Sequence, residues 1–148
     1  MSWRSFRALA RHWCRRRSVL ELPRHLRRGQ MGELAARRYL EAQGLRFLVA
    51  NFRSKRGEID LVFQSEHGLV FVEVKTRAVQ GWTRPAAAVN RAKRLCLTRA
   101  ALDYLHALHN PKVGFRFDIV EVLLDEETLA ELRHIPNAFT LSKPYRYG

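Results

Sequence analysis

The segment Asn51–Arg77 decides how this chain folds: N-F-R-S-K-R-G-E-I-D-L-V-F-Q-S-E-H-G-L-V-F-V-E-V-K-T-R. Apolar and polar residues alternate through much of it, and Val, Ile and Phe dominate. This pattern is typical of half-buried β-strands. It predicts strands at Glu58–Ser65 and Leu69–Thr76, joined by a turn at residues 66–68.

Three ionisable residues interrupt these strands: Asp60 in the first, and Glu73 and Lys75 in the second. Successive strand side chains point to opposite faces of a sheet, so Glu73 and Lys75 share one face. Charged side chains are seldom buried unless they are paired or bound to a metal. The arrangement suggests a metal and phosphate site. The alternatives are the solvated face of an edge strand and a structural Glu–Lys pair.

If Asp60 lies opposite Glu73 across the hairpin, the register of the two strands is set. The neighbouring pairs are then apolar and share the other face: Ile59 with Val74, Leu61 with Val72, and Phe63 with Val70. The preceding hairpin, whose first strand is Arg46–Arg53, pairs Phe52 with Ile59, Ala50 with Leu61, and Leu48 with Phe63. Both hairpins need four-residue connections, Ser54–Gly57 and Ser65–Gly68. A slip of one residue would place Asp60 and Glu73 on opposite faces, unless a bulge intervenes.

A helix is predicted at Gln30–Gln43, with Gly44 as its C-terminal stop. Its apolar stripe consists of Met31, Leu34, Ala35, Tyr39 and Ala42. Glu33 lies off that stripe, where it could form a surface ion pair with Arg37 one turn later.

A second helix is expected at about Ala86–His109, after Pro85. Lys93 interrupts its apolar stripe of Val89, Leu97, Ala101, Leu105 and Leu108. Either Lys93 extends along the apolar surface to water, or it reaches the site and holds a phosphate. Arg91 belongs to a basic face of this helix that could meet backbone phosphates.

The remaining elements carry less chemistry. A loop at Val79–Arg84 contains Trp82, which could stack on an unpaired base or be a surface aromatic. Phe115–Leu124 is the last expected strand, and its Asp118 is expected at the surface.

The net charge of +13 over 148 residues predicts attraction to polyanions. Residues 1–28 hold nine arginines and one glutamate, so much of the charge belongs to this segment. We expect a poorly ordered extension that helps to hold polyanions, followed by a single domain at 29–148. The alternative is a basic amphipathic helix that binds a membrane surface or nucleic acid.

Several classes of function are disfavoured. Cys14 and Cys96 form no C-x-x-C pair, and the histidines show no spacing for a zinc site. No apolar run approaches a membrane span, and no Gly-rich phosphate loop or nucleophile elbow is present. We therefore expect a cytoplasmic location, no membrane insertion and no small-molecule cofactor, whereas a homodimer stays open.

The motifs also carry a resemblance. An Asp followed, after a hairpin, by E-x-K is similar to the PD-(D/E)xK nuclease superfamily, which includes restriction enzymes and archaeal Holliday-junction resolvases. The ordered set looks like the YraN-type bacterial family: G-E-L-A-A-R-R-Y-L-E-A-Q-G from Gly32, then N-F-R, G-E-I-D-L-V, F-V-E-V-K-T-R and I-P-N-A-F. It covers Gln30 to Phe139.

The element order predicts an α/β domain with a mixed sheet flanked by helices. The resemblance implies a nuclease-like αβββαβ core. The resemblance does not supply the cellular substrate. Together with the site residues it leads us to expect an enzyme that hydrolyses phosphodiester bonds in nucleic acid, DNA rather than RNA, with Mg²⁺ or Mn²⁺. Two alternatives stay open: a non-catalytic nucleic-acid-binding module on the same fold, and a membrane-surface or partner-binding protein acting through the basic N-terminus.

In this interpretation Asp60, Glu73 and the Val74 carbonyl ligate the metal, because hard cations take oxygen ligands. The resemblance adds Glu33 from the first helix. Lys75 would hold the attacking water or stabilise charge on the phosphate. The residues expected to contact nucleic acid are Arg77, Arg91 and Lys93.

Overall fold

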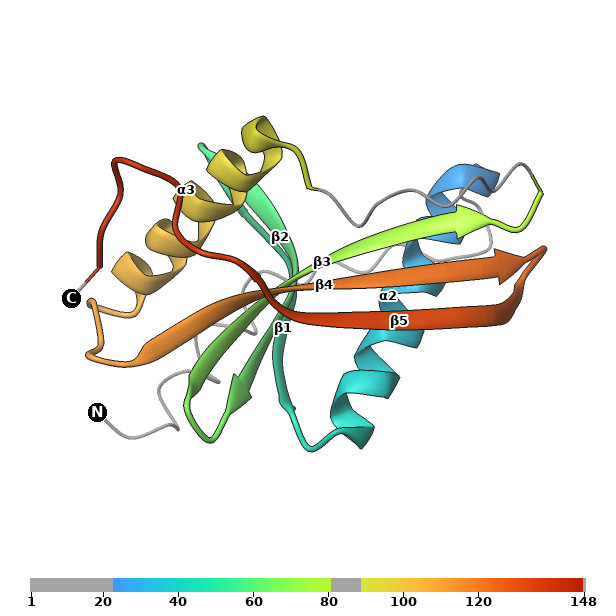
Figure 1. The fold of residues 1–148 in the computed structure, drawn as a ribbon, viewed down its shortest axis with the longest axis horizontal. Helices are drawn as coiled ribbons and strands as arrows, with labels where there is room; N and C mark the ends of the chain where they lie inside the picture. The colour runs from blue at the N-terminus through green and yellow to red at the C-terminus, as the bar shows by residue number, and fades with distance from the viewer. Residues whose placement is uncertain (1–22, 81–88, 148) are drawn as a thin grey trace.

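The computed structural model describes residues 23–80 and 89–147. The elements in chain order are α2 (Arg24–Ala42), β1 (Arg46–Ser54), β2 (Gly57–Ser65), β3 (Gly68–Ala78), α3 (Arg91–Ala107), β4 (Gly114–Asp125) and β5 (Thr128–Phe139) (Figure 1). The strands form one sheet in the order β1-β2-β3-β4-β5. β3 and β4 run parallel, and the other neighbouring strands are antiparallel.

The two helices cover opposite faces of this sheet (Figure 1). On one face α2 packs through Ala36 and Leu40 onto Val70 and Val72 of β3. On the other face α3 packs through Leu97 and its neighbours against a second apolar cluster. The predicted α/β fold with a nuclease-like αβββαβ order is therefore confirmed. Because both faces of β3 are covered, its first six residues form a continuous buried run.

Most of the predicted strand register is confirmed. β2 pairs with β3 through Leu61–Val72 and Phe63–Val70, and β1 pairs with β2 through Phe52–Ile59 and Ala50–Leu61. The predicted pair of Leu48 with Phe63 is wrong. Phe63 pairs with Phe47, because an irregularity between Phe47 and Val49 shifts the register of β1.

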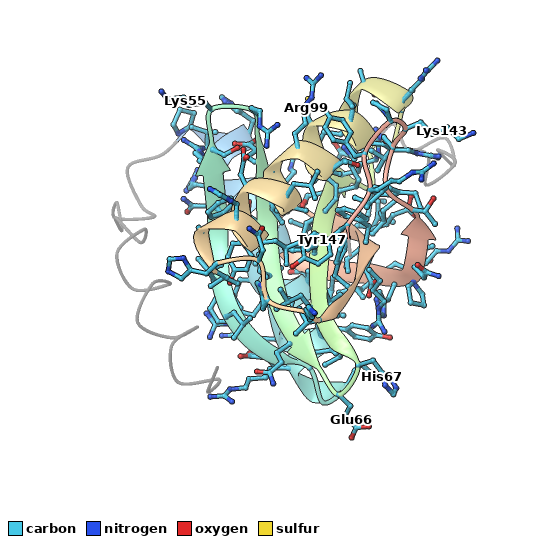
Figure 2. All side chains as sticks on the ribbon, turned by 90° about the vertical axis from the view of Figure 1, so that its left-hand side faces the viewer. Lys55, Glu66, His67, Arg99, Lys143 and Tyr147 are labelled. Carbon is cyan, nitrogen blue, oxygen red and sulfur yellow. The ribbon has the colours of Figure 1, made fainter. Side chains whose placement is uncertain are left out.

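Both predicted hairpin turns form, and they use the same local chemistry. Each turn opens with a serine, Ser54 in the first and Ser65 in the second, whose hydroxyl accepts a hydrogen bond from a backbone N–H in the turn. The donor is Arg56 in the first turn and His67 in the second. The hydroxyl also donates to the carbonyl of the closing glycine. Figure 2 shows Lys55 and Glu66 in these turns at opposite ends of the strands.

The paired register of β2 with β3 stops at Leu61–Val72, one residue short of Asp60. Beyond it, the Asp60 carboxylate accepts a hydrogen bond from the Val74 N–H at 2.7 Å. Ile59 packs in the cluster beneath α3, whereas Val74 packs against the cluster beneath α2. The predicted pair of Ile59 with Val74 is therefore wrong. The two strands separate here, and the Asp60 side chain accepts the hydrogen bond of the Val74 N–H on β3.

α2 differs from the prediction in its start and in its buried face. It begins at Arg24, so residues 24–28, expected in the extension, are helical. Its buried residues are Gly32, Ala36 and Leu40. Of the predicted stripe, Met31 and Ala35 are partly buried against the same cluster, whereas Leu34, Tyr39 and Ala42 are exposed. Leu34 is 48% exposed because the helix is rotated to place its smallest residues on the sheet. Gly44, with φ of 87°, ends the helix as predicted.

α3 begins later than predicted, at Arg91. The Asn90 side chain caps it by accepting a hydrogen bond from the Lys93 N–H at 2.8 Å. Val89 and Asn90 are not helical, so a continuous helix from Ala86 is wrong. The predicted stripe from Val89 to Leu108 is confirmed as buried, apart from Lys93. The expected roles of Trp82, Pro85 and residues 1–22 lie outside the described residues.

β5 and the environment of Asp118 were not predicted. Asp118 is fully buried, so the surface expectation is wrong. Its carboxylate accepts hydrogen bonds from Arg116 and from the Asn137 N–H at 2.8 Å, and it lies 2.8 Å from His134 Nε2. Burial favours protonation, but these contacts outweigh it and lower the pKa of Asp118. This cluster ties β5 to β4, and β5 contains the I-P-N-A-F motif.

Candidate active site

Glu73 is the buried centre of the predicted site. It lies on β3, and its side chain is only 4% exposed. Lys75 Nζ lies 2.9 Å from Glu73 Oε1, and Lys93 Nζ lies 3.2 Å from Oε2. Oε2 is buried, and the Lys93 ammonium group is its one close partner among the described residues. A carboxylate oxygen can accept two hydrogen bonds, so Oε2 keeps acceptor capacity beyond its contact with Lys93.

Asp60 lies beside Glu73 where β2 and β3 separate. Its pKa is raised to about 7, first because burial disfavours the charged form and second because the Glu73 carboxylate repels it. Glu33 adds further repulsion. The hydrogen bond from the Val74 N–H and the charge of Lys93 act in the opposite direction. The protein thus holds acidic groups close enough to raise the free energy of their charged forms.

Glu33 reaches this cluster from α2. Its Oε2 accepts a hydrogen bond from Asn51 Nδ2 at 3.0 Å. Burial raises the pKa of Glu33 despite this bond, and the carboxylates of Glu58 and Glu73 add to the effect. Asn51 has a φ of 53°, a left-handed conformation that asparagine tolerates better than most residues. Asn51 lies between Ala50 and Phe52, which pair with Leu61 and Ile59, so this backbone conformation occurs opposite Asp60.

The alternative ion pair between Glu33 and Arg37 is not the observed arrangement. Arg37 instead contacts Glu41 one turn later, with Nε 3.4 Å from Oε1, and lies over the ring of Phe47. Glu33 is therefore directed toward the site residues Asn51 and Glu73 and not along its own helix.

Lys93 joins the site from the first turn of α3. Its side chain is 30% exposed, and its ammonium group contacts Glu73 instead of extending only to water. Burial disfavours its charge, but the carboxylates of Glu73 and Asp60 outweigh burial and raise the pKa of Lys93. The structure thus brings together Glu33, Asp60, Glu73, Lys75 and Lys93 from four elements.

The other predicted residues lie around this cluster. Arg77 follows Lys75 on β3, and both line a small pocket of about 30 Å³ with Glu121 and Arg133. Arg91 is exposed at the first position of α3. Val74 lies between Glu73 and Lys75, with its N–H bound to Asp60. A separate pocket of about 340 Å³, beside the start of α2, includes none of the predicted site residues.

The donor set fits a cation that uses few protein ligands. Within residues 23–80 and 89–147, no group of three or more His, Cys, Asp or Glu side chains is arranged to hold a metal ion. Mg²⁺ usually keeps several waters and takes only one or two carboxylates. The remaining acceptor capacity of Glu73 and the mutual repulsion of Asp60 and Glu73 suit such an ion.

Sequence reasoning missed the pairing of Asp118 with His134 because the two residues are 16 positions apart and follow no motif. It also missed the hydrogen bond from Val74 to Asp60, which depends on the separation of two strands. No local sequence pattern predicts either contact.

The fold and the cluster define an α/β protein with a nuclease-like core. The chain belongs to the family described as "Uncharacterised protein family UPF0102", the YraN-type family, whose model matches residues 32–122. It is 41% identical over 116 residues to a UPF0102 protein of Chlorobaculum tepidum, covering 75% of this chain and 90% of that relative. It is 43% identical over 111 residues to a UPF0102 protein of Symbiobacterium thermophilum, covering 75% and 94%. Within the described ranges, no helix is long and apolar enough to span a membrane.

Proposed function

We propose that this protein is a Mg²⁺- or Mn²⁺-dependent nuclease that hydrolyses phosphodiester bonds, with DNA rather than RNA as its substrate. The observation that carries this proposal is the buried Glu73 carboxylate, which keeps acceptor capacity beside a second buried carboxylate, Asp60, and two lysines. A purely structural ion-pair cluster would not be expected to place two mutually repelling carboxylates together in a buried position. The proposal includes the cytoplasmic location that the sequence predicts, since it gives access to cellular DNA.

The metal would be held by Asp60, Glu73 and the Val74 carbonyl, and Glu33 would join through a bridging water. When bound, the ion would polarise the scissile phosphate and acidify a water. The same positive charge would offset the burial and the repulsion that raise the pKa of Asp60 and Glu33. A bound ion would therefore lower the free energy of the charged carboxylates, which their surroundings otherwise disfavour.

Lys75 and Lys93 would supply positive charge for the phosphate. Each contacts one oxygen of Glu73, which fixes both ammonium groups beside the site. A lysine ammonium has three donors, so each lysine keeps donors for a phosphate oxygen or for the attacking water. Lys75 would orient the water or stabilise the growing charge, and Lys93 would hold the phosphate. Arg77 and Arg91 would contact the nucleic-acid backbone without reading its sequence.

A second candidate is a nucleic-acid-binding module that does not cleave. The observation in its favour is that Glu73 already has an ion pair at each oxygen, as a structural carboxylate would. The two functions differ in what the metal does. Binding alone needs no divalent cation, whereas cleavage stops when the cation is removed.

The test is incubation of the purified protein with branched and linear DNAs in Mg²⁺, Mn²⁺ or EDTA. Glu73→Gln should reduce cleavage at least 100-fold, because the ion loses a charged ligand, while DNA binding in EDTA persists. The matched control is Glu66→Gln, the same chemical change at the exposed hairpin turn (Figure 2). Metal-independent binding without cleavage on every substrate would support the module instead, and equal cleavage by Glu73→Gln would contradict the assigned site.

A further inference from the structure

β5 forms one edge of the sheet, at the opposite end of the strand order from β1 (Figure 1). It is 12 residues long, and most of its residues are exposed or only half-buried. Within the described part of the chain, no strand pairs with its outer edge. An exposed edge presents unpaired N–H and C=O groups, which is a template for another strand.

Two irregularities limit where such pairing can occur. The register of β4 with β5 shifts between Leu123 and Leu124 and again between Phe117 and Ile119. Bulges of this kind often protect an edge from unwanted pairing. Between them, Glu131–Ile135 pairs residue by residue with Ile119–Leu123. This regular five-residue stretch is therefore the part of the edge that can accept a strand.

The charges of this stretch are self-complementary. When two copies run antiparallel about a two-fold axis at Leu132, Glu131 of each copy lies opposite Arg133 of the other. A shift of the axis to Arg133 would instead place two arginines opposite each other. Opposite charges stabilise a cross-strand pair and like charges destabilise it, so the charge pattern selects the first register. Glu131 is exposed, and the Arg133 side chain is 65% exposed.

The geometry points to a homodimer in which the β5 edges of two copies pair about a two-fold axis at Leu132. The five-stranded sheets of the two copies then become one continuous sheet. Such a contact is small compared with permanent interfaces, so the dimer dissociates on dilution.

This dimer has a consequence that rests on the proposed function. The two-fold axis of an antiparallel strand pair is perpendicular to the sheet, so the same face of both copies points the same way. Lys75 and Arg77 of β3 line one pocket with Glu131 and Arg133 of β5, so the site region adjoins the interface. Five strand spacings separate the two β3 strands, or about 24 Å. The two sites would act together on a substrate that presents two strand segments to one face.

The test is charge reversal followed by restoration. Glu131→Arg and Arg133→Glu should each weaken the dimer at least tenfold, because like charges then oppose across the axis. An equimolar mixture of these variants should dimerise again, since each copy then faces opposite charges, and so should the double variant E131R/R133E. Mass is measured by sedimentation over a range of concentrations, on full-length protein freed of nucleic acid. The controls are Glu66→Arg and Lys112→Glu, which make the same net-charge changes at exposed positions away from β5.

A wild type that stays monomeric at every concentration would overturn the inference. So would a dimer that neither single reversal weakens, or single reversals whose loss the mixture and the double variant fail to restore. Circular dichroism of each variant separates loss of pairing from loss of folding. These measurements use neither metal nor DNA, so a result that contradicts the dimer would leave the nuclease proposal intact. A well-behaved dimer that cleaves nothing would contradict only the proposed function.

Discussion

At the scale of the residue, the site is defined by carboxylates whose charged forms are disfavoured by their surroundings. Asp60 illustrates this, because burial and the charge of Glu73 raise its pKa to about 7. Glu73 and Glu33 are drawn into the same region by different elements, a β-strand and a helix. A protein keeps such a cluster when the charges serve a function, since stability alone would favour apolar residues.

The raised pKa of Asp60 predicts a pH dependence of stability. The pKa of Asp60 is raised from its ordinary value of 3.8 to about 7 in the folded protein, so folding takes up a proton at pH values between these two. The contribution of Asp60 to the free energy of unfolding is therefore greatest at low pH and is lost as the pH rises to about 7.

Asp60→Asn removes this titration while keeping an acceptor for the Val74 N–H. In EDTA, the variant should gain stability relative to wild type as the pH rises from 5 to 8. Denaturant unfolding at several pH values measures the difference. Parallel curves for the two proteins would show that Asp60 is not held in a destabilised charged state. Addition of Mn²⁺ should stabilise wild type more than the variant.

At the scale of the element, the position of α2 depends on a glycine at its contact with the sheet. A Cβ added to Gly32 would lie 1.8 Å from Thr76 Oγ1 on β3. The helix can therefore approach β3 this closely only because residue 32 has no side chain. The neighbouring residue, Glu33, is placed beside Asn51 by the same contact.

Gly32→Ala should destabilise the protein by about 1–3 kcal/mol, because overpacking outweighs the better helix propensity of alanine. Gly29→Ala is the matched control, since a Cβ there meets nothing within 4 Å. It should stabilise the same helix by up to about 1 kcal/mol. Thr76→Ala added to Gly32→Ala should recover part of the loss by removing the nearest atom. Denaturant unfolding of the variants tests this, and equal effects of the two alanines would contradict the packing argument.

At the scale of the whole molecule, the positive charge is divided between the domain and the segment that precedes it. Residues 1–22 contain six arginines and one glutamate and none of the proposed site residues. We expect this segment to add affinity for polyanions without taking part in the chemistry. Because α2 begins at Arg24, a deletion that tests this should end at residue 22 and not at residue 28.

Deletion of residues 1–22 should weaken DNA binding and leave the cleavage rate at saturating substrate unchanged. If all six arginines contacted phosphates, the slope of log K against log salt would fall by about 5. Binding titrations at several salt concentrations measure this slope, with unfolding curves as the check that the domain is intact. An unchanged slope, or a deletion that unfolds the domain, would contradict a role limited to affinity.

The sequence by itself determined the strand pattern, the two hairpin turns and the identity of the acidic cluster. Alternation of apolar residues identifies strands, and the S-x-x-G repeats at Ser54 and Ser65 encode their turns locally. The combination of Asp60 with Glu73 and Lys75 stands out because charged residues are rare inside strands. These signals are local, so they do not depend on which elements later pack together.

The tertiary structure alone decided the face of α2, the burial of Asp118 and the existence of β5 as a strand. Leu34 looks apolar in sequence but is exposed, because small residues allow α2 to approach β3. β5 contains Pro136 and a left-handed Asn137, and it becomes a strand only through its pairing with β4. Asp118 can be buried only when partners distant in sequence satisfy its charge. Each of these outcomes depends on contacts between segments far apart in the chain, and no local pattern encodes such contacts.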